Sequence, residues 1–239
     1  MLRSHNQRST ARTSEPGMFS MKLRTVIFYM DGTITHFNLD SKEVKRTFLT
    51  ELEKMNLRTA EMTEKSTIII LLKQMKQHVD TADYERLRNL FYGLLEEMEV
   101  KAAQEAKFHP GVLDTLRELR QHGLLLGLVT NNSRKGTDIS LERLGLNDFF
   151  QTVVTRDDCQ EMKPDPGSLR KALKELNVQA DEAIFVGDSV NDIIAAKEAG
   201  LSSVAVPTGS TSKEDLLLHQ PDYILSSLSD LPSLILSRT

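Results

Sequence analysis

The chain has 239 residues, a formal net charge of −4, and 39% hydrophobic and 27% charged residues. This length and balance suit one large domain, or a main domain with an insert, and provide enough apolar residues for a core. The negative charge gives no reason to expect a nucleic-acid partner, and the single cysteine, Cys159, excludes a disulfide framework. The longest apolar runs, such as residues 68–72, are too short to cross a bilayer. We therefore expect a cytoplasmic protein with no nucleic-acid or membrane partner.

Residues 1–20 differ in composition from the rest of the chain. They hold several Arg, Ser and Thr residues, one acidic residue (Glu15) and no apolar block, which argues against a secretory signal. We interpret this leader as a disordered tail ahead of a second possible start at Met18 or Met21. An Arg-rich, acid-poor leader is also compatible with a mitochondrial transit peptide, so a mitochondrial location is the alternative.

From residue 22 onward, apolar strand patterns alternate with amphipathic helix patterns. Short apolar runs bounded by Gly, Asn and Asp are typical of parallel strands that are buried on both faces. The alternation predicts an α/β fold with a doubly wound parallel sheet and right-handed crossovers. Strands are predicted at residues 23–29, 124–130, 152–155, 183–187, 202–206 and, at an edge, 222–225. Helices are predicted at residues 111–122, 134–144, 166–176, 190–199 and 212–219.

The segment between the first two strands breaks this alternation. It has no convincing strand and instead predicts helices at residues 41–56, 62–78 and 81–107. We therefore divide the chain into a leader (1–20), an α/β core (21–36 and 108–239) and a helical cap (37–107). An insert at this point lies at the carboxyl edge of the sheet, where open α/β sheets bind ligands, and it could act as a lid. The alternative is a stabilising bundle without a gating role.

Four polar motifs follow four successive predicted strands. They are Asp31-Gly32-Thr33, Thr130-Asn131-Asn132, Lys163-Pro164-Asp165-Pro166 and Gly187-Asp188-Ser189-Val190-Asn191-Asp192. Each has an ordinary structural explanation by itself: a turn, a strand end, or a helix cap in which Asp192 pairs with Ser189. Together they bring carboxylates, a hydroxyl, an amide-rich turn and a lysine to one edge of the sheet. These groups are suited to binding phosphate and Mg²⁺.

In their order and spacing, the four motifs resemble the haloacid dehalogenase superfamily of phosphatases. The tracts HPGVLDTLRELRQHGLLLGLVTNN and FVGDSVNDIIAAKEAGLSSVAVPTG resemble its phosphoglycolate phosphatase-like branch, and residues 37–107 resemble its helical C1 cap. The resemblance covers residues 22 to about 230. It implies a Rossmann-like core, Mg²⁺ as cofactor and a small phosphorylated metabolite, such as phosphoglycolate or a sugar phosphate, as substrate. A monomer or a homodimer would both fit.

The resemblance also implies roles for individual residues. The first Asp of the family pattern D-x-D-G-T attacks phosphorus and ligates Mg²⁺, and here that position holds Tyr29. The second Asp, a general acid/base whose carbonyl binds the metal, corresponds to Asp31. The other matching positions are Thr130, Asn131 and Lys163 for phosphate, and Asp188 and Asp192 for the metal.

Tyr29 puts the family reaction in question. A phenol with a pKa of about 10 is protonated at neutral pH, unless a lysine or a metal lowers that pKa. The ring removes a charged metal ligand, and it is longer than an Asp side chain, so it would intrude on the phosphate. We therefore expect an inactive or strongly impaired phosphatase; the alternative is a non-catalytic protein that binds a phosphometabolite or a protein.

Three weaker signals have structural interpretations. Cys159 lacks a nearby His in sequence and is interpreted as a bystander rather than a nucleophile. His109 precedes Pro110-Gly111 at a predicted helix start and is interpreted as a turn residue rather than part of a cap hinge. The cluster of Glu96, Glu97 and Glu99 predicts a solvated helix face.

Overall fold

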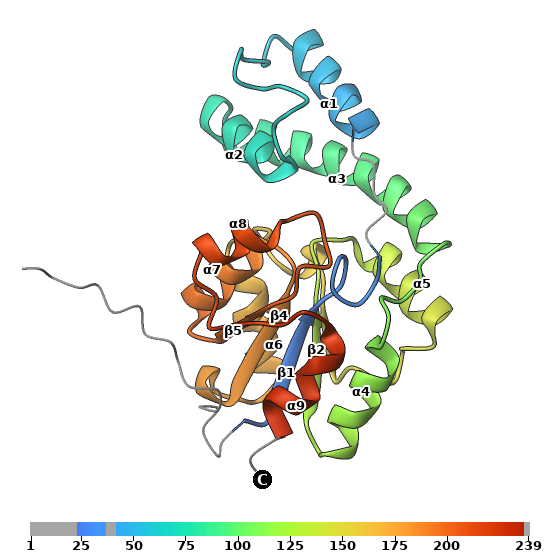
Figure 1. Ribbon diagram of the computed structural model, residues 1–239. Coiled ribbons are helices and arrows are strands. Elements are labelled where there is room, and N and C mark those ends of the chain that lie inside the picture. Colours follow the sequence, from blue (N-terminus) through green and yellow to red (C-terminus); the bar gives the residue numbers. More distant parts are fainter. Residues whose placement is uncertain (1–22, 37–41, 237–239) are drawn as a thin grey trace, which may run out of the picture.

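A computed structural model describes residues 23–36 and 42–236 (Figure 1). Its centre is a six-stranded parallel sheet in the order β3-β2-β1-β4-β5-β6. The strands are β1 (Thr25–Tyr29), β2 (Leu125–Val129), β3 (Thr152–Val154), β4 (Ala183–Gly187), β5 (Ser202–Ala205) and β6 (Tyr223–Ile224). All six correspond to predicted strands, and the doubly wound α/β fold is confirmed. The expected leader, residues 1–20, lies outside the described residues.

Helices cover both faces of the sheet (Figure 1). Side chains alternate along β1, so that Val26 and Phe28 join one apolar core while Ile27 joins the other. The first core includes α4 (Val112–Gln121), α5 (Arg134–Leu144) and α9 (Leu231–Leu236), of which only α9 was not predicted. The second core includes α6 (Gly167–Leu176) and α7 (Val190–Ala199), and α8 (Lys213–Leu218) packs beside α7.

Three helices are inserted between β1 and α4: α1 (Lys42–Lys54), α2 (Ile68–His78) and α3 (Thr81–Ala103). They have an apolar core of their own, in which the Phe48 and Phe91 rings stack with their centroids 4.1 Å apart. Helix α2 begins later than predicted because Thr67 caps it, accepting a hydrogen bond from the Ile70 amide. Figure 1 shows this helical insert above the end of the sheet at which the strands terminate.

The strand order reverses at the centre of the carboxyl edge, which is where open α/β sheets bind ligands. The chain passes from β1 to β2 on one side and returns to β4 on the other, so the loops after these strands diverge there. All four predicted motifs lie at this edge, in the loops that follow the strands or at the adjoining ends of β4 and α7. Within the described part of the chain, no helix combines the length and apolarity needed to span a membrane.

Candidate active site

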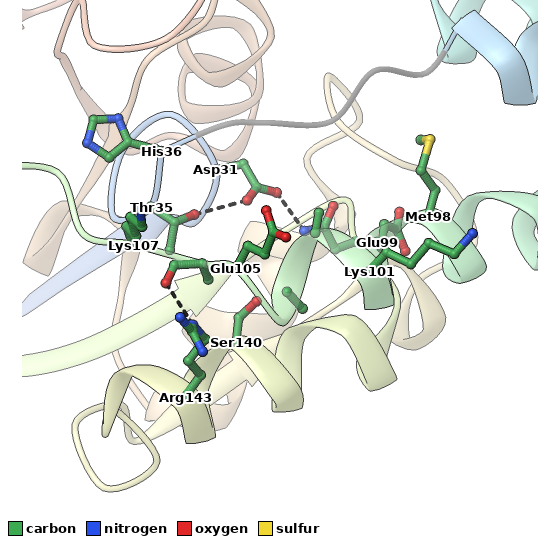
Figure 2. A pocket seen from close by; sticks show the side chains of 14 residues that line it. Asp31, Thr35, His36, Met98, Glu99, Lys101, Glu105, Lys107, Ser140 and Arg143 are labelled. Atoms are coloured by element: carbon green, nitrogen blue, oxygen red, sulfur yellow. Dashed lines mark hydrogen bonds between the residues drawn. The ribbon is translucent and has the colours of Figure 1, made fainter.

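The turn after β1 fixes the carboxylate of Asp31. The Thr35 hydroxyl donates to Asp31 Oδ1 at 3.0 Å, and the Asn132 side-chain amide donates to Oδ2 at 2.6 Å (Figure 2). Burial raises the pKa of Asp31 to about 6, although these two hydrogen bonds oppose the shift. Asp31 is therefore held in one orientation with a pKa close to neutral, which suits a group that exchanges protons.

The turn after β2 serves two other parts of the site. Thr130 is buried, and its hydroxyl accepts a hydrogen bond from the backbone amide of Asn132 at 3.1 Å. The Asn131 side chain accepts from the Lys163 backbone amide at 3.1 Å and donates to the Lys163 carbonyl at 3.5 Å. The Asn131 side chain thus holds the Lys163 backbone, so the phosphate contact expected of this residue would have to come from its main chain.

Lys163 lies at the centre of the site. Its side chain is 1% exposed and its ammonium forms an ion pair with Asp192. The same ammonium lies over the Tyr29 ring, 2.9 Å from the ring centroid. Burial lowers the pKa of Lys163, while Asp192, Asp188 and Asp31 oppose that change. The lysine is thus surrounded by acids and by the aromatic rings of Tyr29 and Phe185.

Tyr29 carries a neutral phenol. Burial raises its pKa well above 10, and the carboxylates of Asp31, Asp192 and Asp188 raise it further. The backbone amide of Asn131, which lies close to the phenol oxygen, only partly opposes this. The lysine on the ring therefore does not produce a phenolate at neutral pH, and position 29 offers no anion.

The Asp188 carboxylate lies against two glycines, where any residue with a side chain would collide with it. A Cβ on either Gly32, which has φ of 80°, or Gly209 would overlap the Asp188 carboxylate. The Thr33 hydroxyl donates to Asp188 Oδ1 at 3.1 Å. Burial, followed by repulsion from Asp192, raises the pKa of Asp188 to about 7. A bound cation would relieve this cost of holding a carboxylate charged in a buried place.

Asp192, an expected metal ligand, has Ser189 and Lys163 as its partners in the structure. Its Oδ2 accepts from the Ser189 amide at 2.9 Å and from the Ser189 hydroxyl at 2.6 Å, and its Oδ1 pairs with Lys163. Both oxygens thus serve a helix cap and an ion pair. Across residues 23–36 and 42–236, no three His, Cys, Asp or Glu side chains are arranged to hold a metal ion. Asp31 is expected to bind the metal through its backbone carbonyl rather than its side chain, so the metal roles of Asp31, Asp188 and Asp192 stay predictions.

The acids that remain fit Mg²⁺ only in part. Asp188 offers its carboxylate and Asp31 its backbone carbonyl as hard oxygen ligands, and burial raises the pKa of both carboxyl groups although Lys163 opposes the shift. The carboxylate that the family pattern places at position 29 is replaced by a neutral ring, and Asp192 pairs with Lys163.

Two predictions from weaker signals had different outcomes. Glu99 is buried rather than solvated, because it forms an ion pair with the buried Arg156; the prediction for this residue was wrong. The partner lies 57 positions away, and no local pattern indicates it. Burial raises the pKa of Cys159, which agrees with its interpretation as a bystander.

A cavity of about 760 Å³ opens beside Asp31, between the end of α3, α5 and the turn after β1 (Figure 2). Asp31 and Asn132 line it from the core, and Lys101 and Lys107 come from α3 and the chain segment that follows it. The cavity gives a small ligand access to Asp31.

The chain matches known proteins over most of its length. Residues 26–206 match the family model of haloacid dehalogenase-like hydrolases. Pyrophosphatase PpaX from Bacillus mycoides is 29% identical over 215 residues, which cover 88% of this chain and 96% of the relative. PpaX from Bacillus velezensis is 41% identical over 120 residues, covering 50% of this chain and 56% of the relative.

Solved structures share the fold. A hydrolase from Pseudomonas syringae superposes with a TM-score of 0.66 at 23% identity, covering 90% of this chain and 99% of that one. A predicted phosphoglycolate phosphatase from Haemophilus somnus gives a TM-score of 0.62 at 23% identity, covering 91% and 99%. The family match spans most of the sheet and all four motifs, so the chain belongs to the haloacid dehalogenase-like hydrolases.

Proposed function

We propose that this chain is a phosphatase scaffold of its family that binds a small phosphorylated metabolite but turns it over very poorly. The observation that carries the proposal is the neutral Tyr29 under the Lys163 ammonium, at the position where the family pattern places an attacking carboxylate. Loss of a covalent nucleophile removes several powers of ten from the rate of such an enzyme. The other motif residues are those that the family pattern expects, which supports binding of a phosphate compound.

Three of those residues support phosphate chemistry. Asp31 has a pKa of about 6, which suits proton transfer near neutral pH. Lys163 carries positive charge beside the site, and the Thr130 hydroxyl lies in the neighbouring turn. The Asp188 carboxylate and the Asp31 backbone carbonyl would hold Mg²⁺, which supplies positive charge to the site when bound.

The substrate class follows from the resemblance and from the names of the relatives. The Bacillus relatives are named as pyrophosphatases, and one structural neighbour as a predicted phosphoglycolate phosphatase. We propose that pyrophosphate, phosphoglycolate and similar small phosphate compounds are the ligands to test first.

The second candidate is a protein that binds such a ligand without turnover as its normal role. This reading is favoured by the Lys163–Asp192 ion pair, because each charge has a partner that does not depend on an acid at position 29. The charges of Lys163 and Asp192 therefore compensate each other with tyrosine at position 29.

One set of variants separates the two candidates. We would measure phosphate release from pyrophosphate, phosphoglycolate and p-nitrophenyl phosphate, with MgCl₂, for the unmodified chain, Tyr29→Asp and Tyr29→Asn. The Asn variant matches the Asp variant in shape but lacks its charge. We expect Tyr29→Asp to exceed both others by about 10³-fold or more.

Other outcomes have clear meanings. If Tyr29→Asp is inactive while pyrophosphate raises the melting temperature of the unmodified chain, the non-catalytic candidate is supported. Strong Mg²⁺-dependent turnover by the unmodified chain would contradict the role assigned to Tyr29.

A further inference from the structure

A buried ion pair joins the helical insert to the core. Glu99 lies in α3, and Arg156 begins a short 3-10 helix, Arg156–Asp158, that follows β3. Their side chains are only 3% and 1% exposed. Charges are rarely buried so completely unless each is paired and hydrogen-bonded, so this pair has a defined geometry.

Arg156 holds α3 at two places. Its guanidinium pairs with Glu99, and it also donates to the Tyr92 carbonyl at 3.1 Å. The same group lies over the Tyr92 ring, 4.8 Å from the centroid. Tyr92 and Glu99 are two helical turns apart, so one arginine fixes both the position and the rotation of this part of α3.

The pair also holds three consecutive residues of the turn after β2. The Arg156 guanidinium donates to the Asn131 carbonyl at 3.1 Å, and the Arg156 backbone amide donates to the Asn132 carbonyl at 3.1 Å. The second oxygen of Glu99 accepts from the Ser133 amide at 3.0 Å. The insert and the turn are thus connected through both members of the pair.

Helices α3 and α5 are closely packed beside this ion pair. A Cβ on Gly136, in the first turn of α5, would lie 3.1 Å from Glu99 Cβ. Helices α3 and α5 therefore approach closely where Glu99 reaches the core, and a shift of α3 would be transmitted to the start of α5.

The turn that is held in this way positions two groups of the candidate active site. The Asn131 side chain forms hydrogen bonds with both the amide and the carbonyl of Lys163, and the Asn132 side chain donates to the Asp31 carboxylate. We infer that Arg156 and Glu99 are positioning residues: through the turn at 131–133 they set where Lys163 and Asp31 stand, and so link the placement of α3 to the site. The catalytic part of this inference rests on the function proposed above.

The inference is tested in the full chain by NMR. We would record the side-chain amide resonances of Asn131 and Asn132, and the exchange rate of the Ser133 amide, in Glu99→Gln and Arg156→Lys. We expect both sets of resonances to move and Ser133 to exchange about tenfold faster or more. The control is Lys76→Met, which removes the exposed Lys76–Glu161 pair between insert and core without touching the turn, and which should change neither.

Kinetics in the Tyr29→Asp background give a second readout. Arg156→Lys should lower kcat by about 10- to 100-fold with a smaller change in KM, because small displacements of the reacting groups slow the chemical step more than they weaken substrate binding. Lys76→Met should leave both constants within about twofold, since an exposed pair contributes little. If Tyr29→Asp is itself inactive, the proposed function fails, while the amide measurements still decide this inference.

The inference is contradicted if Glu99→Gln and Arg156→Lys fold but leave the Asn131 and Asn132 side-chain resonances and the Ser133 amide exchange rate unchanged. If neither variant folds, hydrogen exchange in the unmodified chain decides: the Ser133 amide should exchange no faster than the amides of α3 from Tyr92 to Glu99. Faster, independent exchange at Ser133 would show that the insert does not hold the turn.

Discussion

The Lys163 ammonium lies on the face of the Tyr29 ring and at the same time pairs with Asp192. An aromatic face attracts a cation through its quadrupole, so the tyrosine partly replaces the missing negative charge without ionising. The phenol pKa is raised well above 10 by burial and by three acids, which keeps the ring neutral. This arrangement explains how the site can stay ordered without a carboxylate at position 29.

Magnesium should distinguish the variants at position 29. Tyr29→Asp adds an acid beside Asp31 and Asp188, so without metal we expect it to be less stable than the unmodified chain. With Mg²⁺ at about 100 times its Kd, binding would stabilise the Asp variant by about 2.7 kcal/mol. Thermal unfolding with and without MgCl₂ measures this.

Tyr29→Asn is the control for that measurement, because it removes the ring without adding charge. Equal responses of the Asp and Asn variants to Mg²⁺ would show that a carboxylate at position 29 does not bind the metal.

Removing the lysine should strongly destabilise the fold. In Lys163→Met, the 3% exposed Asp192 side chain loses its ion-pair partner and is left charged in a buried place. Breaking one side of a buried ion pair costs about 3–5 kcal/mol. Urea unfolding at pH 7 gives the free energy of unfolding.

Lys171→Met provides the matched comparison, because Lys171 pairs with Glu175 at 3.2 Å on the surface, with side chains 39% and 41% exposed. We expect a loss of about 0–1 kcal/mol there. Similar losses in the two methionine variants would refute the structural importance assigned to Lys163.

The stability contributed by Asp158 should depend on pH. Burial by itself would raise its pKa, but hydrogen bonds from the Thr155 amide and hydroxyl, both at 2.8 Å, and the nearby Arg134 guanidinium lower it overall. Because the folded-state pKa is lowered, the contribution is present above the unfolded pKa of about 3.9 and is lost as the pH falls through the folded value.

We therefore expect Asp158→Asn to cost about 0.5–1.5 kcal/mol at pH 7, because solvent screens this exposed residue, and the gap in stability between variant and parent to close below about pH 4. Urea unfolding at several pH values measures the gap. The exposed Asp148 serves as control, with Asp148→Asn changing stability little at any of them. A gap for Asp158→Asn that stays constant down to pH 3 would contradict the assignment.

Glycine at position 209 should be needed for its close approach to Asp188. A methyl group there would overlap the Asp188 carboxylate, so Gly209→Ala should displace that acid and cost about 1–3 kcal/mol. In the Tyr29→Asp background it should also abolish the response to Mg²⁺.

Gly93→Ala is the control, because alanine should be tolerated there without any clash. Gly93 lies within α3, and a Cβ there would meet nothing within 4 Å. We expect this variant to gain about 0.5–1 kcal/mol from the better helix propensity of alanine. Thermal unfolding of both variants compares them, and a stable Gly209→Ala protein with an unchanged Mg²⁺ response would rule out the proposed crowding of Asp188.

The sequence by itself determined the sheet and the place of its motifs. The first strand was predicted at 23–29 and is found at Thr25–Tyr29, and the fourth was predicted at 183–187, where β4 lies. These predictions succeed because a strand buried on both faces is a continuous apolar run. Since all parallel strands end at one edge, the four motifs had to come together there.

Only the tertiary structure decided which polar groups pair. Glu99 stands beside Glu96 and Glu97 in a pattern typical of a solvated face, yet it is buried because α3 packs where Arg156 reaches it. The cap that Asp192 forms with Ser189 follows from their spacing in the sequence, but its ion pair with Lys163, 29 positions away, does not. A carboxylate's partner depends on which distant backbone and side chains surround it after packing, and local periodicity carries no information about that.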